Sequence, residues 1–375
     1  MYEKYFSLLI SLADCMVKKV LESGNAFEGK NGPYNNKDTA LRNSAHWYQI
    51  FAFLYHETKE EIYKECSDRL LSYITNAENY GNNMAPKCRT DANIDDINGL
   101  IGPAWTIEGL IYAYRNTHEF KLLDIAYDIF LSQEFDVKDK MWRIIDTHGK
   151  NWGYDLTFNH QLWFAAVGYE LASIVCEDSR RAKIENQCNM FGNNITRHLQ
   201  YYPNGLFCHI AYMGYSGKYK PKYYIKKYLR YISDALCLKN KYSEMYNLEK
   251  GYLCFDLYGF AILKQYNPNL PVFSNPNFRK AVDLGTNEDF LIGMANESPF
   301  NKYAFAYNSP AFEYPFIAMM LRGTADNIIC KKLLDKQIEL TISSDNKYFI
   351  SNVNDPNTLK ARAYELIRFL DLECD

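Results

Sequence analysis

The chain alternates two kinds of helical segment, and this alternation limits the folds that are open to it. In one kind, such as 161–167 and 253–260, apolar residues occupy nearly every position, so the helix must be buried on all sides. In the other kind, such as 59–71, one apolar stripe lies opposite a charged face. Buried helices that alternate with amphipathic ones indicate an inner and an outer ring of helices.

Helical pairs recur along the 375 residues. Their starts lie about 50 to 60 residues apart, which is the length of a helical hairpin with its loops. Across one gap, the separation is about one and a half such intervals. The expected helices cover 6–21, 45–56, 60–74, 103–116, 119–133, 159–175, 181–199, 221–238, 250–266, 311–321, 325–340 and 359–372. This spacing predicts an all-α fold, an (α/α)6-type toroid of helical hairpins, with a plain α-solenoid as the alternative. No linker divides the sequence, so we expect residues 1–375 to form a single toroid domain.

Three long polar loops precede buried helices. They cover residues 25–38, 80–98 and 136–157, and they are rich in Asn, Asp and Gly. Loops longer than about 12 residues inside a compact domain are usually functional. In a toroid, we expect these three mouth loops to border the opening of the central cavity.

The composition excludes several classes of protein. With 47% hydrophobic and 23% charged residues, the chain is typical of globular proteins, and its net charge of −3 offers no broad basic surface for nucleic acid. No apolar run approaches the length of a membrane span, and no convincing signal peptide is present, so the default expectation is a cytoplasmic protein. The ten cysteines form no C-x-x-C pair and are expected to be reduced thiols.

Common cofactor and metal motifs are missing from the sequence. G-x-G-x-x-G, H-E-x-x-H and G-x-S-x-G do not occur, and the near-match to a phosphate-binding loop at 24–31 has Asn31 where Ser or Thr is required. The seven histidines show no local metal-ligand spacing. We therefore predict neither a cofactor nor a metal site.

The start of the expected buried helix at 158–166 is the most informative segment. Asn159 and His160 would lie at its N-terminus, where the helix dipole and the free backbone N–H groups favour an anion and a neutral imidazole that can act as a base. The amide of Asn159 adds a donor for a carboxylate. The structural alternative is a capping Asn followed by a core histidine.

The pattern Asn-His-x-x-Trp-x-Ala-Ala in this segment resembles the Asn-His motif of toroid polysaccharide lyases of the alginate lyase type. A second stretch, 250–260, resembles a later helix of that family, which carries an arginine and, seven residues further on, the catalytic tyrosine. Tyr258 occupies the tyrosine position, whereas Gly251 occupies the arginine position, with Lys250 beside it.

The resemblance implies β-elimination next to a uronic acid. Asn159 would neutralise the carboxylate, His160 would remove the C5 proton, and Tyr258 would protonate the leaving oxygen. Because the arginine is missing, a uronate epimerase that uses the same proton abstraction is an alternative.

Two further segments add candidate side chains. Arg42 and His46 share a helical face, and Trp47 follows, so Arg42 would supply a cation and Trp47 a face for sugar stacking. In the alternative, Arg42 pairs with Asp38 and only fastens the loop.

The other segment, 98–114, places Trp105, Glu108 and Tyr112 on one face. It resembles an inner helix of the six-hairpin glycosidases, which include unsaturated glucuronyl hydrolases, and of toroid proteins from surface-polysaccharide clusters. That resemblance implies catalysis by paired carboxylates. The candidate acids are Glu108, Asp146, Asp155 and Glu313. For any single one, helix capping or pairing with Lys or Arg is the structural alternative.

Taken together, these patterns predict a glycan-processing enzyme with an oligo- or polysaccharide substrate, above all a polysaccharide lyase acting on a uronic-acid-containing glycan. A six-hairpin glycoside hydrolase, a uronate epimerase and a non-catalytic glycan-binding scaffold stand as alternatives. The expected substrate-binding side chains are Arg42, His46, Trp47, Trp105, Glu108, Trp163 and Lys250. No partner nucleic acid and no membrane span are expected, and the oligomeric state stays open.

Overall fold

The computed structural model describes residues 1–212, 220–238, 240–298, 300–342 and 352–374. Its α-helices are α1 (Tyr2–Ser23), α2 (Leu41–Thr58), α3 (Glu61–Ile74), α4 (Ile101–Thr117), α5 (Phe120–Leu131), α6 (Phe158–Ile174), α7 (Asp178–Gly192), α8 (Ile195–His198), α9 (Lys220–Ala235), α10 (Lys241–Tyr266), α11 (Pro276–Gly285), α12 (Glu288–Asn296), α13 (Pro310–Arg322), α14 (Asn327–Thr341), α15 (Pro356–Ala361) and α16 (Ile367–Cys374). Short 3-10 helices are η1 (Gly32–Tyr34), η2 (Ala77–Asn79), η4 (Pro271–Ser274) and η5 (Arg362–Leu366).

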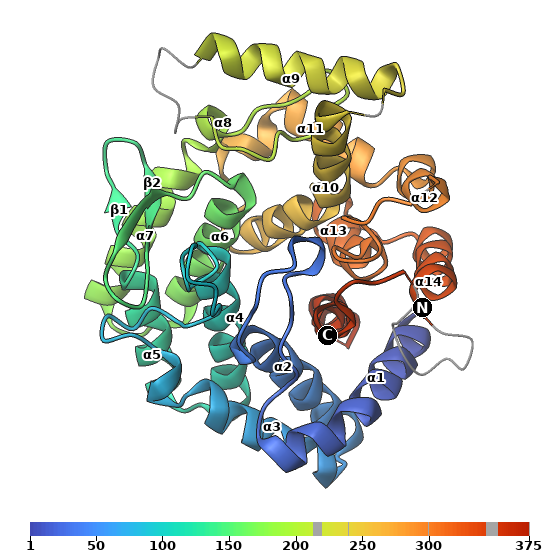
Figure 1. The fold of residues 1–375 in the computed structure, drawn as a ribbon. Coiled ribbons are helices and arrows are strands. Elements are labelled where there is room, and N and C mark those ends of the chain that lie inside the picture. Colours follow the sequence, from blue (N-terminus) through green and yellow to red (C-terminus); the bar gives the residue numbers. More distant parts are fainter. Residues whose placement is uncertain (213–219, 239, 299, 343–351, 375) are drawn as a thin grey trace.

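Six helical segments form a closed inner ring, which confirms the expected toroid. In ring order they are α2, α4, α6, α10, α13 and the C-terminal segment α15–η5–α16, which contacts both α13 and α2 and so closes the circle. Figure 1 looks along the axis of this ring, with α1, α3, α5, α7 and α14 around its outside. Because the last segment returns to the first inner helix, the chain is a toroid and not an open solenoid.

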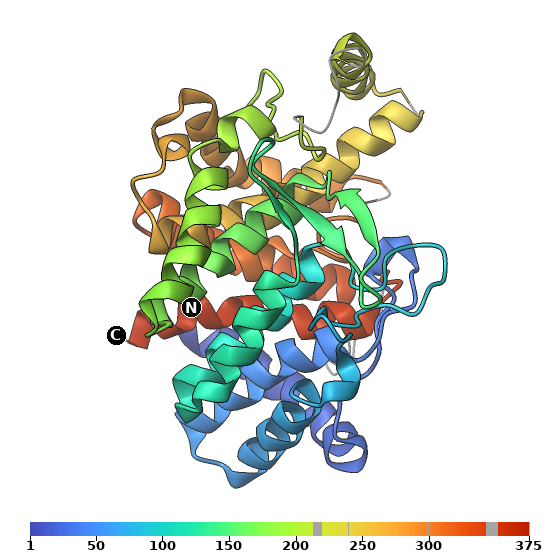
Figure 2. The ribbon, with the colours of Figure 1, turned by 90° about the vertical axis from the view of Figure 1, so that its left-hand side faces the viewer.

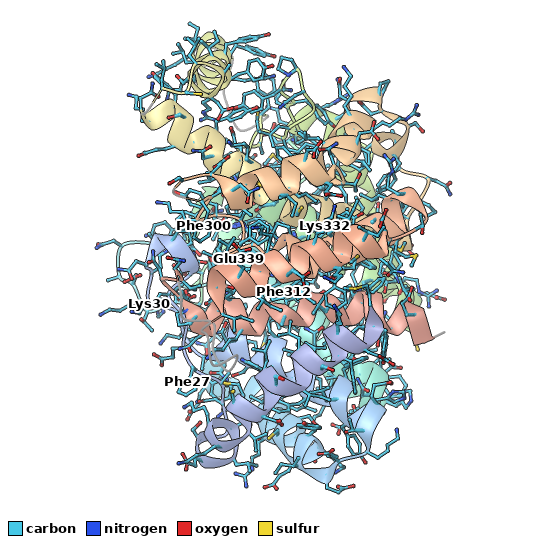
Figure 3. All side chains as sticks on the ribbon, turned by 90° about the vertical axis from the view of Figure 1, so that its right-hand side faces the viewer. Phe27, Lys30, Phe300, Phe312, Lys332 and Glu339 are labelled. Carbon is cyan, nitrogen blue, oxygen red and sulfur yellow. The ribbon has the colours of Figure 1, made fainter. Side chains whose placement is uncertain are left out.

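Burial follows the apolar pattern of each helix. The inner helices α4 and α6 are buried along most of their length. In contrast, the outer helix α3 buries one stripe, spaced by three or four residues, that includes Tyr63, Cys66, Leu70 and Ile74. Figure 3 shows the outer wall near α14, where Lys332 forms an ion pair with Glu288 of α12. The two kinds of helix recognised in the sequence therefore correspond to the two rings.

Several element boundaries differ from the expectation. Helix α10 begins earlier, at Lys241, because Asn240 and Ser243 form a reciprocal capping box at its N-terminus. The expected last helix is divided into α15, η5 and α16, and the helices α11 and α12 were not expected.

The loop expected at 136–157 is also more ordered than the sequence indicated. It contains an antiparallel sheet of β1 (Phe135–Asp136), β2 (Met141–Ile145) and β3 (Asn151–Tyr154), in the order β1-β2-β3. A short hairpin of this kind packs too few apolar side chains to give a strong periodic signal.

The mouth loops and the sheet gather at one end of the ring (Figure 2), and the C-terminus lies at the opposite end. We call these the mouth end and the far end. Inner helices α4 and α6 begin at the mouth end, where Ile101 and Thr157 line a pocket, and they approach the far end at Arg115 and Glu170, which line another. The two helices therefore run in the same direction, and both point their positive dipole ends toward the mouth.

At the far end, Arg368 of α16 joins two inner helices through buried carboxylates. It donates to Glu108 of α4 at 2.7 Å and to Glu170 of α6 at 2.6 Å. Both carboxylates are almost fully buried, so each needs a cation to remain charged. No disulfide joins the nine cysteines whose side chains the structure describes, and none of the described helices is long and apolar enough to cross a bilayer.

We expect the substitution Arg368→Met to lower the free energy of unfolding by about 3 kcal/mol or more, because it leaves two buried carboxylates without their shared partner. Chemical denaturation followed by circular dichroism measures the change. Arg322→Met is the matched control, since Arg322 pairs with Asp283 at the exposed surface and should matter by about 0.5 kcal/mol or less. Equal effects of the two substitutions would contradict the importance of this junction.

Candidate active site

A pocket of 290 Å³ lies at the mouth end, where the inner helices α4 and α6 begin and the mouth loops meet. Its wall combines histidine, carboxylate, tyrosine, arginine and tryptophan side chains from segments that are far apart in the sequence. It includes the side chains of Tyr34, Arg89, Asp95, Trp105, Asp155, His160, His209, Tyr252 and Arg362.

His160 and Asp155 form a hydrogen-bonded pair on the pocket wall. The Nδ1 atom of His160 lies 2.8 Å from Oδ2 of Asp155. The carboxylate also accepts hydrogen bonds from the backbone N–H groups of Leu100, at 2.9 Å, and Thr157, at 3.0 Å. Burial opposes ionisation of Asp155, but the imidazole of His160 and these two donors outweigh it and lower the pKa of the carboxyl group. An ionised Asp155 holds the proton on Nδ1 and leaves Nε2 as the ring atom able to accept a proton.

The close approach that forms this pair depends on Gly99. This residue has a φ of +58°, and a Cβ atom on it would lie 2.4 Å from Oδ2 of Asp155 and 2.7 Å from Nδ1 of His160. A side chain at position 99 would therefore displace the pair.

A second histidine, His209, lines the same pocket. Its ring meets the ring of Tyr252 edge-on at 4.9 Å. Burial is the main cause that lowers the pKa of His209 to about 3, and the nearby imidazole of His160 acts in the same direction. His209 is consequently a neutral imidazole at ordinary pH, on the same pocket as the His160–Asp155 pair.

Two tyrosines share a hydrogen bond at the pocket. The hydroxyl oxygens of Tyr252, on α10, and Tyr34, on η1, lie 2.8 Å apart. Burial raises the pKa of Tyr252 well above its ordinary value, so its hydroxyl group keeps its proton and can act as a donor.

Two arginines line the pocket beside the carboxyl groups of Asp95 and Asp155. Arg89, from a mouth loop, lies 3.9 Å from Asp38 and 3.8 Å from Asp95, distances at which its ion pairs are weak. The guanidinium of Arg362, on η5, lies over the ring of Phe255 at 4.6 Å.

Behind the pocket, Arg362 holds two buried carboxyl groups. It lies 2.9 Å from Glu313 of α13 and 2.6 Å from Glu365. Burial raises the pKa of Glu313 to about 7, which the charge of Arg362 opposes only in part. One arginine therefore serves two carboxyl groups, of which Glu313 gains its proton close to neutral pH.

Of the three residues expected to form a lyase site, only His160 lines the pocket. Asn159 is buried and lies against the carboxyl group of Asp256, whose pKa is raised well above its ordinary value by burial although the amide of Asn159 opposes this. Tyr258 is fully buried, stacks on Trp163 at 5.4 Å and donates to the backbone carbonyl of Glu365 at 2.8 Å. The expected cluster of Asn159, His160 and Tyr258 around one point is therefore not present.

Most expected substrate-binding residues have structural contacts instead. Arg42 is buried against Asp38 at 2.7 Å, as in the alternative that assigned it to fastening the loop. His46 is fully buried and stacks on Tyr364 at 4.0 Å, and Trp47 packs on Phe51. None of these three lines the mouth pocket.

The other members of that group divide between core and pocket. The indole N–H of Trp163 donates to the carbonyl of Phe255, and Lys250 pairs with Glu297 at 2.8 Å, so neither reaches the pocket. Trp105 does line it, but its side chain is only 2% exposed and its ring is covered by the guanidinium groups of Arg42 and Arg362.

Of the four candidate acids, only one lines the mouth pocket. Asp155 lines the pocket, whereas Glu108 pairs with Arg368 at the far end. Asp146 accepts from the backbone N–H groups of the β2–β3 turn and from Trp152, and Glu313 lies behind Arg362.

Sequence reasoning missed the residues that complete the pocket. Three of them had a signal, since Tyr34 and Arg89 lie in expected mouth loops and Tyr252 in the same stretch as Tyr258. His209 and Arg362 had none, because each reaches the pocket from a segment whose local pattern carries no chemistry. Among the residues that the structure describes, no group of three or more His, Cys, Asp or Glu side chains is arranged to hold a metal ion.

Comparisons with known proteins show which proteins this chain is similar to. No family model matches the chain. It is 28% identical over 378 residues to archaeal glycosylation protein Q of Haloferax volcanii, a match that covers 98% of this chain and 97% of that protein.

The similar solved structures are (α/α)6 toroid carbohydrate-active enzymes. An unsaturated glucuronyl hydrolase from Bacillus sp. GL1 has a TM-score of 0.62 at 10% identity and covers 100% of this chain and 97% of its own. A D-mannose isomerase has a TM-score of 0.62 at 12% identity, with 99% and 97% covered. A cellobiose 2-epimerase from Bacillus thermoamylovorans B4167 has 0.58 at 11% identity, with 94% and 93% covered. This chain therefore has the fold of the (α/α)6 toroid carbohydrate-active enzymes.

The substitution Glu313→Gln tests the raised pKa of Glu313, which shares Arg362 with Glu365. The pKa of Glu313 rises from 4.5 to about 7 on folding, so the unfolded chain loses this proton first and the free energy of unfolding falls as the pH rises between these values. Glutamine does not titrate. We therefore expect the melting temperature of the variant, relative to the native chain, to rise by about 2 °C or more between about pH 4.5 and about pH 8.

Differential scanning calorimetry measures this difference. Glu339→Gln is the control, because Glu339 is an exposed partner of Lys336 and its removal should leave the difference independent of pH. A constant difference for Glu313→Gln as well would contradict the raised pKa.

Proposed function

We propose that this chain processes a saccharide by moving a proton at a sugar carbon, with His160 as the general base. The observation that carries the proposal is the His160–Asp155 pair. A histidine whose Nδ1 atom is held by an ionised carboxylate presents the opposite nitrogen as an oriented base. The fold shared with sugar epimerases, an isomerase and glycosidases supports a saccharide as the substrate.

An acidic sugar fits the charges of the pocket. Arg89 and Arg362 supply positive charge, and helices α4 and α6 begin there with their positive dipole ends. A uronic acid bound with its carboxylate near these groups would have a more acidic proton on the neighbouring carbon, because the negative charge that develops on deprotonation is stabilised.

Epimerisation is the outcome that we favour. His160 takes the proton from the carbon next to the carboxylate, and a proton returned to the opposite face inverts that carbon. Tyr252 is the group for this second step, since its protonated hydroxyl lines the pocket with His160. The overall change adds and removes one proton and needs no cofactor.

β-Elimination is the second candidate, and the protonated Tyr252 favours it. The same deprotonation followed by loss of the oxygen at the next carbon makes an unsaturated uronate, and Tyr252 in place of Tyr258 would protonate that oxygen. Hydrolysis by Asp95 and Asp155 fits less well. It requires one carboxyl group with a raised pKa, whereas the pKa of Asp155 is lowered.

Proton transfer is tested by incubating the chain with uronic-acid oligosaccharides in deuterium oxide. We expect deuterium on the carbon beside the carboxylate, detected by NMR, and a rate that falls by about 100-fold or more in His160→Ala. Asp155→Asn should lower the rate and shift its pH profile, because it removes the charge that orients the base. His148→Ala is the control, since His148 lies on a mouth loop with its side chain 86% exposed and does not line the pocket.

The same reactions separate the alternatives. Ultraviolet absorbance of an unsaturated uronate that depends on His160 would assign the lyase reaction. New reducing ends without deuterium incorporation would overturn the proposal in favour of hydrolysis, and sugar binding without any reaction would assign a binding scaffold.

Arg89→Met tests the acidic substrate. We expect KM for a uronic-acid substrate to rise by about tenfold or more, because a charged hydrogen bond is lost, while KM for the methyl ester of the same sugar changes little. Steady-state rates on both substrates measure this difference, with Arg322→Met as the exposed control. An equal rise for acid and ester would contradict carboxylate binding by Arg89.

A further inference from the structure

Helix α9 has the reverse of the usual amphipathic arrangement. It lies outside the ring, packed on α10, and protrudes at the edge of the molecule in Figures 2 and 3. Among the α9 side chains that the structure describes, the buried ones are the polar Lys227, Arg230 and Ser233. A helix on the surface of a globular protein normally turns its apolar stripe inward and its charged face outward.

The outward face of α9 is apolar. Ile225 is 60% exposed, Tyr228 53% and Ile232 48%, and the exposed Leu229 and Leu236 continue the stripe at helical spacing. Of the fourteen large hydrophobic side chains that are exposed in the described part of the chain, seven lie between Tyr224 and Leu238. The apolar exposure is therefore concentrated on one short segment instead of scattered over the surface.

Buried ion pairs hold α9 in this orientation. Arg230 donates to Glu249 of α10 at 2.8 Å, and the hydroxyl of Tyr202 donates to the same carboxylate at 2.6 Å. Asp234 pairs with Lys250 at 3.3 Å. Rotating the helix to bury its apolar stripe would break these pairs and leave Glu249 buried without a cation, so the outward apolar face is a stable feature of the fold.

The charge of α9 indicates what covers that face. Lys220–Ala235 contains five basic residues and one acidic residue, a net charge of +4, whereas the whole chain carries −3. The exposed Lys222 and Lys226 lie on the helix beside the apolar stripe. An apolar stripe bordered by lysines fits an anionic lipid surface, where the stripe enters the acyl boundary and the ammonium groups meet the lipid headgroups.

We propose that α9 is an interfacial helix that docks this chain onto an anionic membrane surface. Ile225, Tyr228, Leu229, Ile232 and Leu236 enter the lipid, and no part of α9 crosses the bilayer. The docking site is independent of the reaction in the pocket.

Docking would hold the pocket close to the membrane. Glu249, which anchors Arg230, also accepts a hydrogen bond from the backbone N–H of His209, on the pocket wall, at 3.1 Å. Figure 2 shows α9 toward the end of the ring that carries the mouth loops. The lipid-facing helix and the pocket are thus joined through one buried carboxylate.

Flotation of the full chain with lipid vesicles tests the proposal. We expect binding to phosphatidylcholine vesicles that contain phosphatidylglycerol, weaker binding to phosphatidylcholine alone, and loss of the difference at high salt. The substitutions Ile225→Glu and Ile232→Glu should each weaken binding by about tenfold or more, since each places a charge in the apolar interface. Lys222→Glu with Lys226→Glu should weaken binding to the anionic vesicles only.

Ile328→Glu is the matched control, because Ile328 is 64% exposed on the outer helix α14. All variants replace exposed side chains, so unchanged circular dichroism and melting temperature show that each one folds. The proposal is overturned if the native chain binds neither kind of vesicle, or if the α9 variants and the Ile328 variant bind equally. It is also overturned if sedimentation shows a dimer that the α9 substitutions dissociate while vesicle binding is absent, since a second copy would then cover the stripe.

Discussion

The C-terminal segment α15–η5–α16 closes the ring, and two buried arginines on it make that closure a condition of the fold. Arg362 near the mouth end pairs with Glu313 and Glu365, and Arg368 at the far end pairs with Glu108 and Glu170. Unpaired buried carboxylates cost several kcal/mol each, and of these four only Glu170 has a second cation, Arg115. Helices α4 and α13 therefore depend on a segment that begins more than thirty residues after α13 ends. Ring closure and charge pairing therefore occur together.

The direction of the inner helices follows from the same closure and determines where chemistry can occur. When outer and inner helices alternate around a ring, every inner helix runs the same way, and here α4 and α6 both begin at the mouth. Their backbone N–H groups and dipoles add positive potential to a pocket that already holds Arg89 and Arg362. Leu100 and Thr157, which precede these two helices, donate to Asp155 and so hold the carboxylate that orients His160.

The sequence predicted the ring because its signal is local and repeated. Apolar periodicity identifies a buried helix without knowledge of its neighbours, and the long polar loops mark the mouth. It also predicted His160 at the pocket, because a helix start after a long loop has few other places to lie. The partners of His160 were predicted wrongly in position. Tyr252 and Tyr258 lie six residues apart on α10, which turns them about 120° away from each other, so one lines the pocket and the other enters the core.

Asn159 and α9 both show that a local sequence pattern does not reveal which way a side chain or a helix face points. One residue before His160, Asn159 points instead toward Asp256 of α10, because consecutive residues on a helix lie about 100° apart and only one of them can line the pocket. In α9, periodicity alone reveals a strong amphipathic pattern but not which face meets the protein, and the usual rule buries the apolar side. Here Glu249 decides the orientation, since its buried carboxylate requires Arg230 and thereby turns the apolar stripe outward. A partner on another helix is invisible to local sequence patterns, and it determines both the wall of the pocket and the face that this chain presents to its surroundings.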